Sequence, residues 1–201
     1  MSARLYVEGG GDHNKALDSL CRRGFSEFLR KSGLSGRMPR IVACGGRQQA
    51  FQDFRIALMQ EPNGVVLLVD SEGPVDGLNP WEHVRQRTGD EWERPAGAGD
   101  NQLQLMVQTM EAWFYGDRAA LGTFYGQGFR ASALSARTDI EAIPKSQLFS
   151  ALRDASRDCQ KGEYSKGEHS FHILARIDPA KVRGASPWCE RLLSWLDQVC
   201  R

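Results

Sequence analysis

Apolar and polar positions alternate along the first part of the chain in a way that predicts strands separated by helices. Short apolar runs span residues 4–7, 40–44 and 65–69, and glycine or acidic residues close each of them. Between the runs, apolar residues recur at helical spacing over residues 14–31 and 48–59. A β-α-β-α-β order with short links is typical of a parallel sheet whose faces are covered by helices.

The pattern is lost over residues 73–100, where Gly, Pro, Trp and charged residues mix without periodicity. Such a stretch predicts a long surface excursion of the chain. Trp81 and Trp92 lie within it. The sequence leaves two interpretations open: the two rings anchor the excursion to the core, or they contact a partner.

Periodicity returns with residues 102–107, which alternate as a fourth strand would. From about residue 140 onward, amphipathic helices are joined by polar loops. We therefore predict an α/β fold with a mostly parallel, Rossmann-like sheet flanked by helices. The sheet domain is expected over residues 1–135, and residues 136–201 are expected to form a helical C-terminal extension packed on the same domain.

Composition and charge limit the function classes. With 201 residues and 41% hydrophobic residues the chain can form one domain with a sizeable core. Its 26 basic and 25 acidic residues give a formal net charge of +1, so overall charge does not indicate nucleic-acid binding, although a local basic patch is compatible with it. No apolar segment reaches the roughly 18 residues of a membrane span, and the start, MSARLYVEGGGD, is unlike a secretory signal. We expect no membrane association and a cytoplasmic location.

The cysteines indicate packing rather than chemistry. They are odd in number, form no CxxC pair and have no histidine at zinc-finger spacing. We expect reduced, mostly buried thiols of a cytosolic protein, because no local motif supports a thiol nucleophile. The five positions are Cys21, Cys44, Cys159, Cys189 and Cys200.

Acidic residues follow two of the predicted strands at the point where each strand ends. Glu8 comes directly after the first, and Asp70 and Glu72 come after the third, in the stretch VVLLVDSEG. Ligands bind beyond the carboxyl ends of the strands in a parallel α/β sheet, so the three acids are expected to meet at one edge. Like charges so close are costly unless a cation neutralises them. Hard carboxylate oxygens suit Mg²⁺ or Mn²⁺, and we predict such a site here.

A simpler interpretation exists for each acid, since carboxylates after buried strands also cap helices or lie in solvated turns. The glycines after Glu8 favour the metal site. Gly9 and Gly10 would let the backbone approach a ligand closely and expose N–H groups to an anion near a helix N-terminus. We therefore predict both glycines to be substrate-binding.

At these residues the chain resembles the Toprim domain, the metal-binding fold shared by topoisomerases, primases and overcoming-lysogenization-defect (OLD) nucleases. The signature is a Glu after the first strand, here Glu8, and an Asp-x-Asp or Asp-x-Glu after the third, here Asp70 and Glu72, and the likeness covers roughly residues 3–115. The wider segments YVEGGGD, CGGR, LLVDSE, MEAWF and KGEYSKG resemble a bacterial family of small Toprim-like proteins of undefined function. Members of that family are often encoded beside ATPases in phage-defence or mobile-element loci.

The resemblance implies a Mg²⁺-dependent nuclease acting on DNA or RNA, with Glu8 as ligand or general base and Asp70 and Glu72 as ligands. The chain departs from the topoisomerase pattern in having Glu as the second acid, and it is too short for the additional domains of a topoisomerase or a primase. For a second metal ion, Asp12 and Glu111 are the candidate ligands. Glu111 also fits a surface acid in the first turn of a helix.

Positive groups are expected around such a site, because a phosphate substrate needs cations for binding and for transition-state stabilisation. Arg47 ends the second strand's CGGR segment and is expected to point into the same crevice, as a catalytic and substrate-binding group. Lys145, at the start of a predicted helix, is a candidate for substrate binding.

A glycine- and lysine-rich segment, KGEYSKGEHS, supplies further candidates. Lys161 and Lys166 bracket a loop that could close over a substrate, with Tyr164 available to stack on a base and His169 just beyond. We predict Lys166 to be catalytic as well as substrate-binding. Lysines in polar loops are otherwise commonly just solvated, and a lone histidine is more often structural.

Three other function classes compete with a nuclease. A non-catalytic subunit that binds nucleic acid or a partner protein through the same fold stays open. An aspartyl-phosphate enzyme is disfavoured, because its nucleophilic Asp would follow the first strand, where Glu8 stands. A dinucleotide-binding fold is disfavoured because GGGD lacks the G-x-G-x-x-G spacing.

Overall fold

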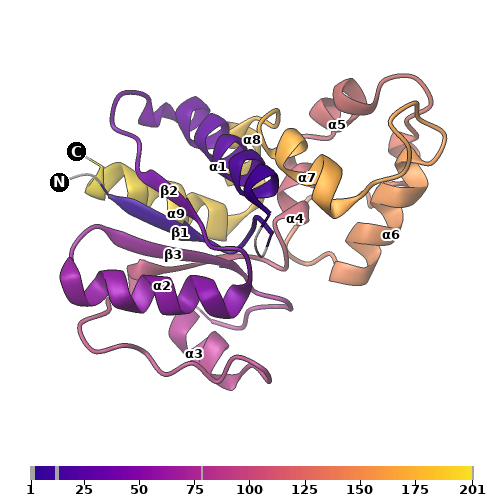
Figure 1. Ribbon diagram of the computed structural model, residues 1–201. Helices are drawn as coiled ribbons and strands as arrows, with labels where there is room; N and C mark the ends of the chain where they lie inside the picture. Colours follow the sequence, from indigo (N-terminus) through magenta and orange to yellow (C-terminus); the bar gives the residue numbers. More distant parts are fainter. Residues whose placement is uncertain (1–2, 12–13, 78, 201) are drawn as a thin grey trace.

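The computed structural model describes residues 3–11, 14–77 and 79–200. Its centre is a four-stranded, all-parallel sheet in the order β2-β1-β3-β4 (Figure 1). The predicted parallel α/β fold is therefore confirmed. The strands are β1 (Arg4–Val7), β2 (Arg40–Ala43), β3 (Val65–Asp70) and β4 (Leu103–Met106).

Helices connect the strands and form the C-terminal part of the chain. Several of them begin at a side chain that accepts a backbone N–H of the first turn: Asn14 Oδ1 accepts from Leu17 N at 3.1 Å, and Asn79 and Ser186 cap helices that continue with proline. The helices are α1 (Lys15–Leu29), α2 (Arg47–Gln60), α3 (Pro80–Gln86), α4 (Glu111–Gly116), α5 (Arg118–Tyr125), α6 (Lys145–Ser156), α7 (Lys166–Leu174), α8 (Pro179–Ala185) and α9 (Pro187–Val199), with shorter helical turns at Arg30–Leu34, Asp100–Gln102 and Ala131–Ala133.

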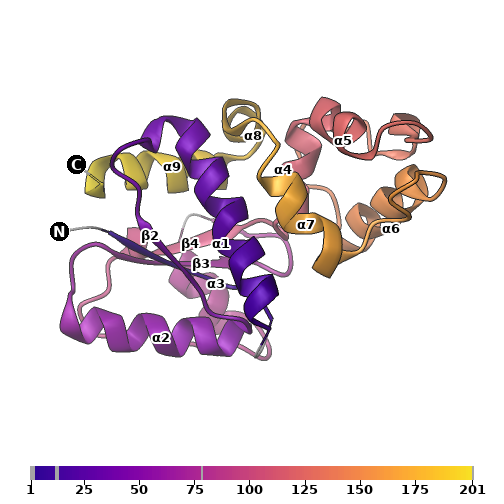
Figure 2. The ribbon, with the colours of Figure 1, turned by 45° about the horizontal axis from the view of Figure 1, so that its top comes forward.

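The sheet separates two hydrophobic layers. Every residue of β3 is buried, and its side chains alternate between the two faces. Val66 and Leu68 join the layer formed by α1, α4 and α7–α9, whereas Leu67 joins the layer formed by α2 and α3. Figures 1 and 2 show α1 and α9 on one side of the sheet and α2 and α3 on the other. A central strand buried on both faces explains the unbroken apolar run of its sequence.

The C-terminal part is helical, as predicted, and packs on the sheet domain. α7 packs against α1, α8 against α4, and α9 against β4. Helices α5, α6 and α7 gather beyond the carboxyl end of the sheet, at the right of Figure 1. The boundary proposed at residue 135 stays a prediction.

The excursion at residues 73–100 is better anchored than its sequence suggested. It contains α3, and Trp81 and Trp92 are each only 3% exposed. The Trp92 ring stacks on Phe51 of α2 at 4.2 Å between ring centroids, and Trp81 packs on Phe54. Of the two interpretations of these tryptophans, anchoring to the core is the one that the structure supports.

Two further predictions concern membranes and thiols. Among the described residues, no helix combines the length and the apolar character that crossing a bilayer requires. All five cysteines are free and buried, as predicted.

Candidate metal centre

Three carboxylates meet at the carboxyl end of the sheet. Glu8 follows β1, Asp70 ends β3, and Glu72 lies two residues further along. Each offers an oxygen to a group whose ligand atoms all lie within 4.8 Å of one another. Parallel pairing of β1 with β3, with Val7 opposite Leu68, brings both strand ends to the same edge. The predicted convergence of the three acids is confirmed.

Glu8 is held against β3 by backbone and side chain. Its N–H donates to the Leu68 carbonyl at 3.0 Å, which extends the strand ladder by one residue. Its Oε2 accepts the Asp70 N–H at 3.2 Å. These two bonds fix the direction in which the Glu8 carboxylate leaves the sheet.

Asp70 is the most buried of the three acids, with a side chain only 4% exposed. Its Oδ1 accepts the Met110 N–H at 2.8 Å, just before α4, and its Oδ2 lies 3.5 Å from Lys166 Nζ. Burial raises the pKa of Asp70 to about 8; Lys166 opposes the rise, whereas the charges of Glu8 and Glu111 add to it. A divalent cation beside this group would return it to the ionised form.

Glu72 has an unusual backbone conformation, with φ of 66°, in the left-handed region. Its N–H donates to the Gln108 carbonyl at 2.8 Å, and its Oε2 accepts a short hydrogen bond from Lys145 Nζ. A non-glycine residue in this region costs about 1 kcal/mol or more, so the surrounding contacts must stabilise the Glu72 backbone in this conformation. In this conformation the Glu72 carboxylate lies beside those of Glu8 and Asp70.

Arg47 opens α2 and points into the cluster, as predicted, but all three nitrogens of its guanidinium have hydrogen-bond partners. Nη1 donates to Glu8 Oε2 at 3.0 Å and to the Asp70 carbonyl, while Nε and Nη2 donate to the two oxygens of Asp90 at 2.7 and 2.6 Å. Burial would lower the pKa of Arg47, and the bonds to Asp90 and Glu8 raise it. Sequence reasoning missed Asp90, because it lies in the excursion that showed no periodicity.

Two lysines also reach the acids, each from the first residue of a helix. Lys145 begins α6 and pairs with Glu72, and Lys166 begins α7 and pairs with Asp70. Burial would lower the pKa of Lys166, but the surrounding acids, Asp70 foremost and then Glu111, raise it to about 12. Lys145 N–H also donates to the side-chain oxygen of Gln108 at 3.1 Å, a contact that no sequence signal indicated.

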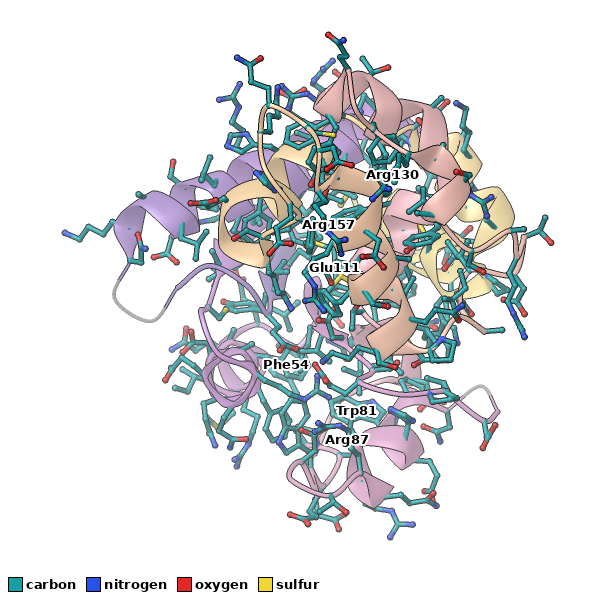
Figure 3. The ribbon with its side chains drawn as sticks, turned by 90° about the vertical axis from the view of Figure 1, so that its right-hand side faces the viewer. Phe54, Trp81, Arg87, Glu111, Arg130 and Arg157 are labelled. Atoms are coloured by element: carbon teal, nitrogen blue, oxygen red, sulfur yellow. The ribbon has the colours of Figure 1, made fainter. Side chains whose placement is uncertain are left out.

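Glu111 lies behind the cluster and is fully buried, so the interpretation as a surface acid is wrong. Figure 3 labels it near the centre of the view. Its Oε1 accepts the Tyr164 hydroxyl at 2.7 Å, and among the described residues its Oε2 has no hydrogen-bond partner. Its charge raises the pKa values of both Asp70 and Lys166. Tyr164 is itself only 4% exposed, so the predicted stacking of a base on its ring does not fit.

The glycines after Glu8 have a structural role. Gly9 has φ of 144° and Gly10 has φ of 93°. Gly9 exchanges two backbone hydrogen bonds with Gly45 at 3.0 and 2.9 Å, which ties the ends of β1 and β2 together. A Cβ on Gly10 would lie 2.3 Å from an Asp18 oxygen. Substrate binding by these glycines stays a prediction.

Two predicted residues are not brought to the cluster. Lys161 is exposed, with its Nζ 5.5 Å from the centre of the Phe124 ring. His169 is 7% exposed, and its Nδ1 accepts the Ser165 N–H at 3.2 Å. It therefore ties down the start of α7, and burial lowers its pKa. Asp12 lies outside the described residues.

The donors of the cluster fit a hard divalent cation. All are carboxylate oxygens, which suit Mg²⁺ or Mn²⁺ better than softer metals. The buried Oε2 of Glu111, without a hydrogen-bond partner in the described part of the chain, and the buried carboxyl of Asp70 are both groups that a nearby cation would stabilise. Glu8, Asp70 and Glu72 are therefore the residues that could hold the ion, with Glu111 behind them.

Comparison with known proteins gives a family match. The model of a domain of unknown function, DUF4276, matches residues 7–197 and so includes the whole cluster. No curated protein and no solved structure matches the chain.

Proposed function

The chain belongs to the family of the domain of unknown function DUF4276, and we propose that it is a Mg²⁺-dependent nuclease that hydrolyses phosphodiester bonds in DNA or RNA. The observation that carries the proposal is the cluster of Glu8, Asp70 and Glu72, with ligand oxygens within 4.8 Å of one another. The resemblance to the Toprim domain of OLD nucleases supports it, because that domain likewise has an acid after its first strand and an acid pair after its third.

In this proposal the three acids would hold a divalent ion, which when bound polarises the phosphodiester and lowers the pKa of an attacking water. Lys145 and Lys166, at the starts of α6 and α7, bring positive charge to the phosphate oxygens as the P–O bond breaks. Arg47 fixes Glu8 in place rather than binding substrate freely, since Asp90 and Glu8 occupy its donors.

The resemblance also suggests a setting for the activity. Toprim-like proteins of this kind are often encoded beside ATPases, so we propose an ATPase as a partner protein and phage defence or a mobile element as the context. A cytoplasmic location goes with this function.

The test is cleavage of end-labelled single-stranded DNA, double-stranded DNA and RNA with Mg²⁺ or Mn²⁺, with metal binding measured separately by calorimetry. Glu8→Gln and Asp70→Asn should abolish both cleavage and metal binding. Glu163→Gln and Asp76→Asn, which change exposed acids that are not members of the cluster, are matched controls and should retain both. Metal-dependent cleavage that survives in Glu8→Gln and Asp70→Asn would refute the assigned site.

The alternative, a non-catalytic subunit that binds nucleic acid or a partner, gives a different result. Wild-type protein would then bind metal at the cluster and would bind labelled nucleic acid or the ATPase. It would cleave none of the substrates with either Mg²⁺ or Mn²⁺.

A further inference from the structure

Each acid of the cluster has its own basic partner. Glu8 pairs with Arg47, Glu72 with Lys145 and Asp70 with Lys166. Each of the three acids thus faces one cationic side chain. A divalent ion entering the site has to compete with these cations for the same oxygens.

The Arg47 side chain is held firmly beside the carboxylates. Its side chain is 13% exposed, Asp90 holds it with two hydrogen bonds, and its guanidinium lies 4.9 Å from the centre of the Trp92 ring. A planar guanidinium held by a bidentate carboxylate is a rigid arrangement. Arg47 is therefore a permanent part of the site.

The two lysines differ from Arg47 in exposure and in number of partners. The Lys145 side chain is 35% exposed and that of Lys166 is 55% exposed. Each forms an ion pair with a single acid of the cluster, through a compact ammonium on a flexible stem. An ammonium of this kind can exchange its partner at little cost.

Their backbones, in contrast, are fixed. Lys145 and Lys166 are the first residues of α6 and α7, and neither Pro144 nor Ser165, which precede them, caps its helix with its own side chain. Lys145 N–H is bonded to Gln108, and the turn before Lys166 is tied down by His169. A released ammonium would therefore stay near the acids, beside helix termini that favour anions.

From these contacts we infer that Lys145 and Lys166 are exchangeable counter-ions, which a divalent cation displaces from Glu72 and Asp70 and so frees to bind a substrate phosphate. The inference rests on the proposed function and adds an order of events to it. Metal enters first, and the phosphate site is complete only afterwards. By linkage, phosphate then strengthens metal binding by the same factor as metal strengthens phosphate binding.

The exchange can be observed directly in the wild-type protein. The chain has six lysines, so the side-chain Cε and Nζ resonances of isotopically labelled lysine give a simple NMR spectrum. Addition of Mg²⁺ should move the resonances of Lys145 and Lys166, assigned with Lys→Met variants, and leave that of Lys161 unchanged. Lysine resonances that stay in place while Mg²⁺ binds would overturn the exchange.

Affinities give the second measurement. Mn²⁺ binding followed by electron paramagnetic resonance should be about tenfold tighter in Lys145→Met and in Lys166→Met, because a competing cation is gone, and unchanged in the control Lys161→Met. Inorganic phosphate should bind the wild type about tenfold more tightly with Mg²⁺ than without it, and the double variant Lys145→Met/Lys166→Met should lose most of that gain. Equal Mn²⁺ affinities in all these variants would refute the inference.

The outcome also separates this inference from the proposed function. If the wild type binds no Mn²⁺, the metal site and the exchange both fail. If it binds Mn²⁺ through Glu8 and Asp70 but the lysine variants behave as the Lys161→Met control does, the site stands and only the exchange is wrong.

Discussion

Replacing Asp70 with asparagine is expected to stabilise the metal-free protein while it removes metal binding. In the folded state the pKa of Asp70 is raised from 3.8 to about 8, chiefly by burial. A carboxyl with a raised folded-state pKa contributes stability that is fully present below the unfolded pKa and is lost as pH rises toward the folded one. Between about pH 4 and pH 8 each pH unit should therefore cost the wild type about 1.4 kcal/mol relative to Asp70→Asn.

At pH 7, roughly three units above its ordinary value of 3.8, the carboxyl group lowers the free energy of unfolding by on the order of 4 kcal/mol. The asparagine side chain does not ionise, and its amide oxygen can still accept the Met110 N–H that Asp70 accepts at 2.8 Å. The attraction to Lys166 that it loses exists only where Asp70 is ionised, above about pH 8. The variant should therefore be more stable than the wild type at neutral pH, and the advantage should stop growing above about pH 8.

Urea denaturation in EDTA at half-unit steps from pH 5 to pH 8.5 measures this difference, with Asp76→Asn as a control at an exposed acid. Mg²⁺ should then stabilise the wild type and the control but leave Asp70→Asn unchanged, because only a folded state with an intact site gains from the ligand. A stability difference between the wild type and Asp70→Asn that does not vary with pH would show that Asp70 is ionised throughout and that the burial argument is wrong.

Three other variants test the surroundings of the site by equilibrium denaturation. Tyr164→Phe removes the one hydrogen bond that the Glu111 carboxylate accepts from the described part of the chain, which should cost about 1–3 kcal/mol in EDTA and less in Mg²⁺. Gly9→Ala puts a Cβ 3.1 Å from a ring carbon of α7 at a residue with φ of 144°, and about 1–3 kcal/mol should be lost whether or not metal is present. Arg47→Lys breaks the bidentate pair with Asp90 and should cost about 3 kcal/mol, whereas a loss below about 1 kcal/mol would show the pair to be dispensable.

The part of the site that lies on the strands could be predicted from the sequence. The apolar run of β3 shows where that strand ends, and the glycines after β1 show the same for the first strand. Parallel strands share a carboxyl edge, so Glu8, Asp70 and Glu72 had to meet there if the sheet was parallel. Local patterns and one topological rule were sufficient for this step.

The rest of the site depends on packing between distant segments. Tyr164 occurs in a polar, lysine-rich stretch, yet the packing of α5–α7 beyond the sheet buries it beside Glu111. Asp90 is 43 positions from Arg47 in the sequence, in a segment without periodicity. The two residues meet where the Trp92 ring stacks on Phe51 of α2. No spacing in the sequence encodes such contacts.

Three energetically costly features of the fold lie together at the carboxylates, and that bears on function. Asp70 is a buried acid with a raised pKa, Glu72 occupies a left-handed backbone conformation, and Glu111 keeps an unpartnered buried oxygen. Each could be relieved by a single substitution: asparagine for Asp70, glycine for Glu72 and glutamine or an apolar residue for Glu111. Similar features occur elsewhere among the described residues, such as the left-handed Glu91 and the unpartnered Thr109 Oγ1, but these three lie at the same group of carboxylates. A bound cation would reduce the electrostatic costs at Asp70 and Glu111 together and would give the strained Glu72 a ligand to hold, so one cause accounts for all three.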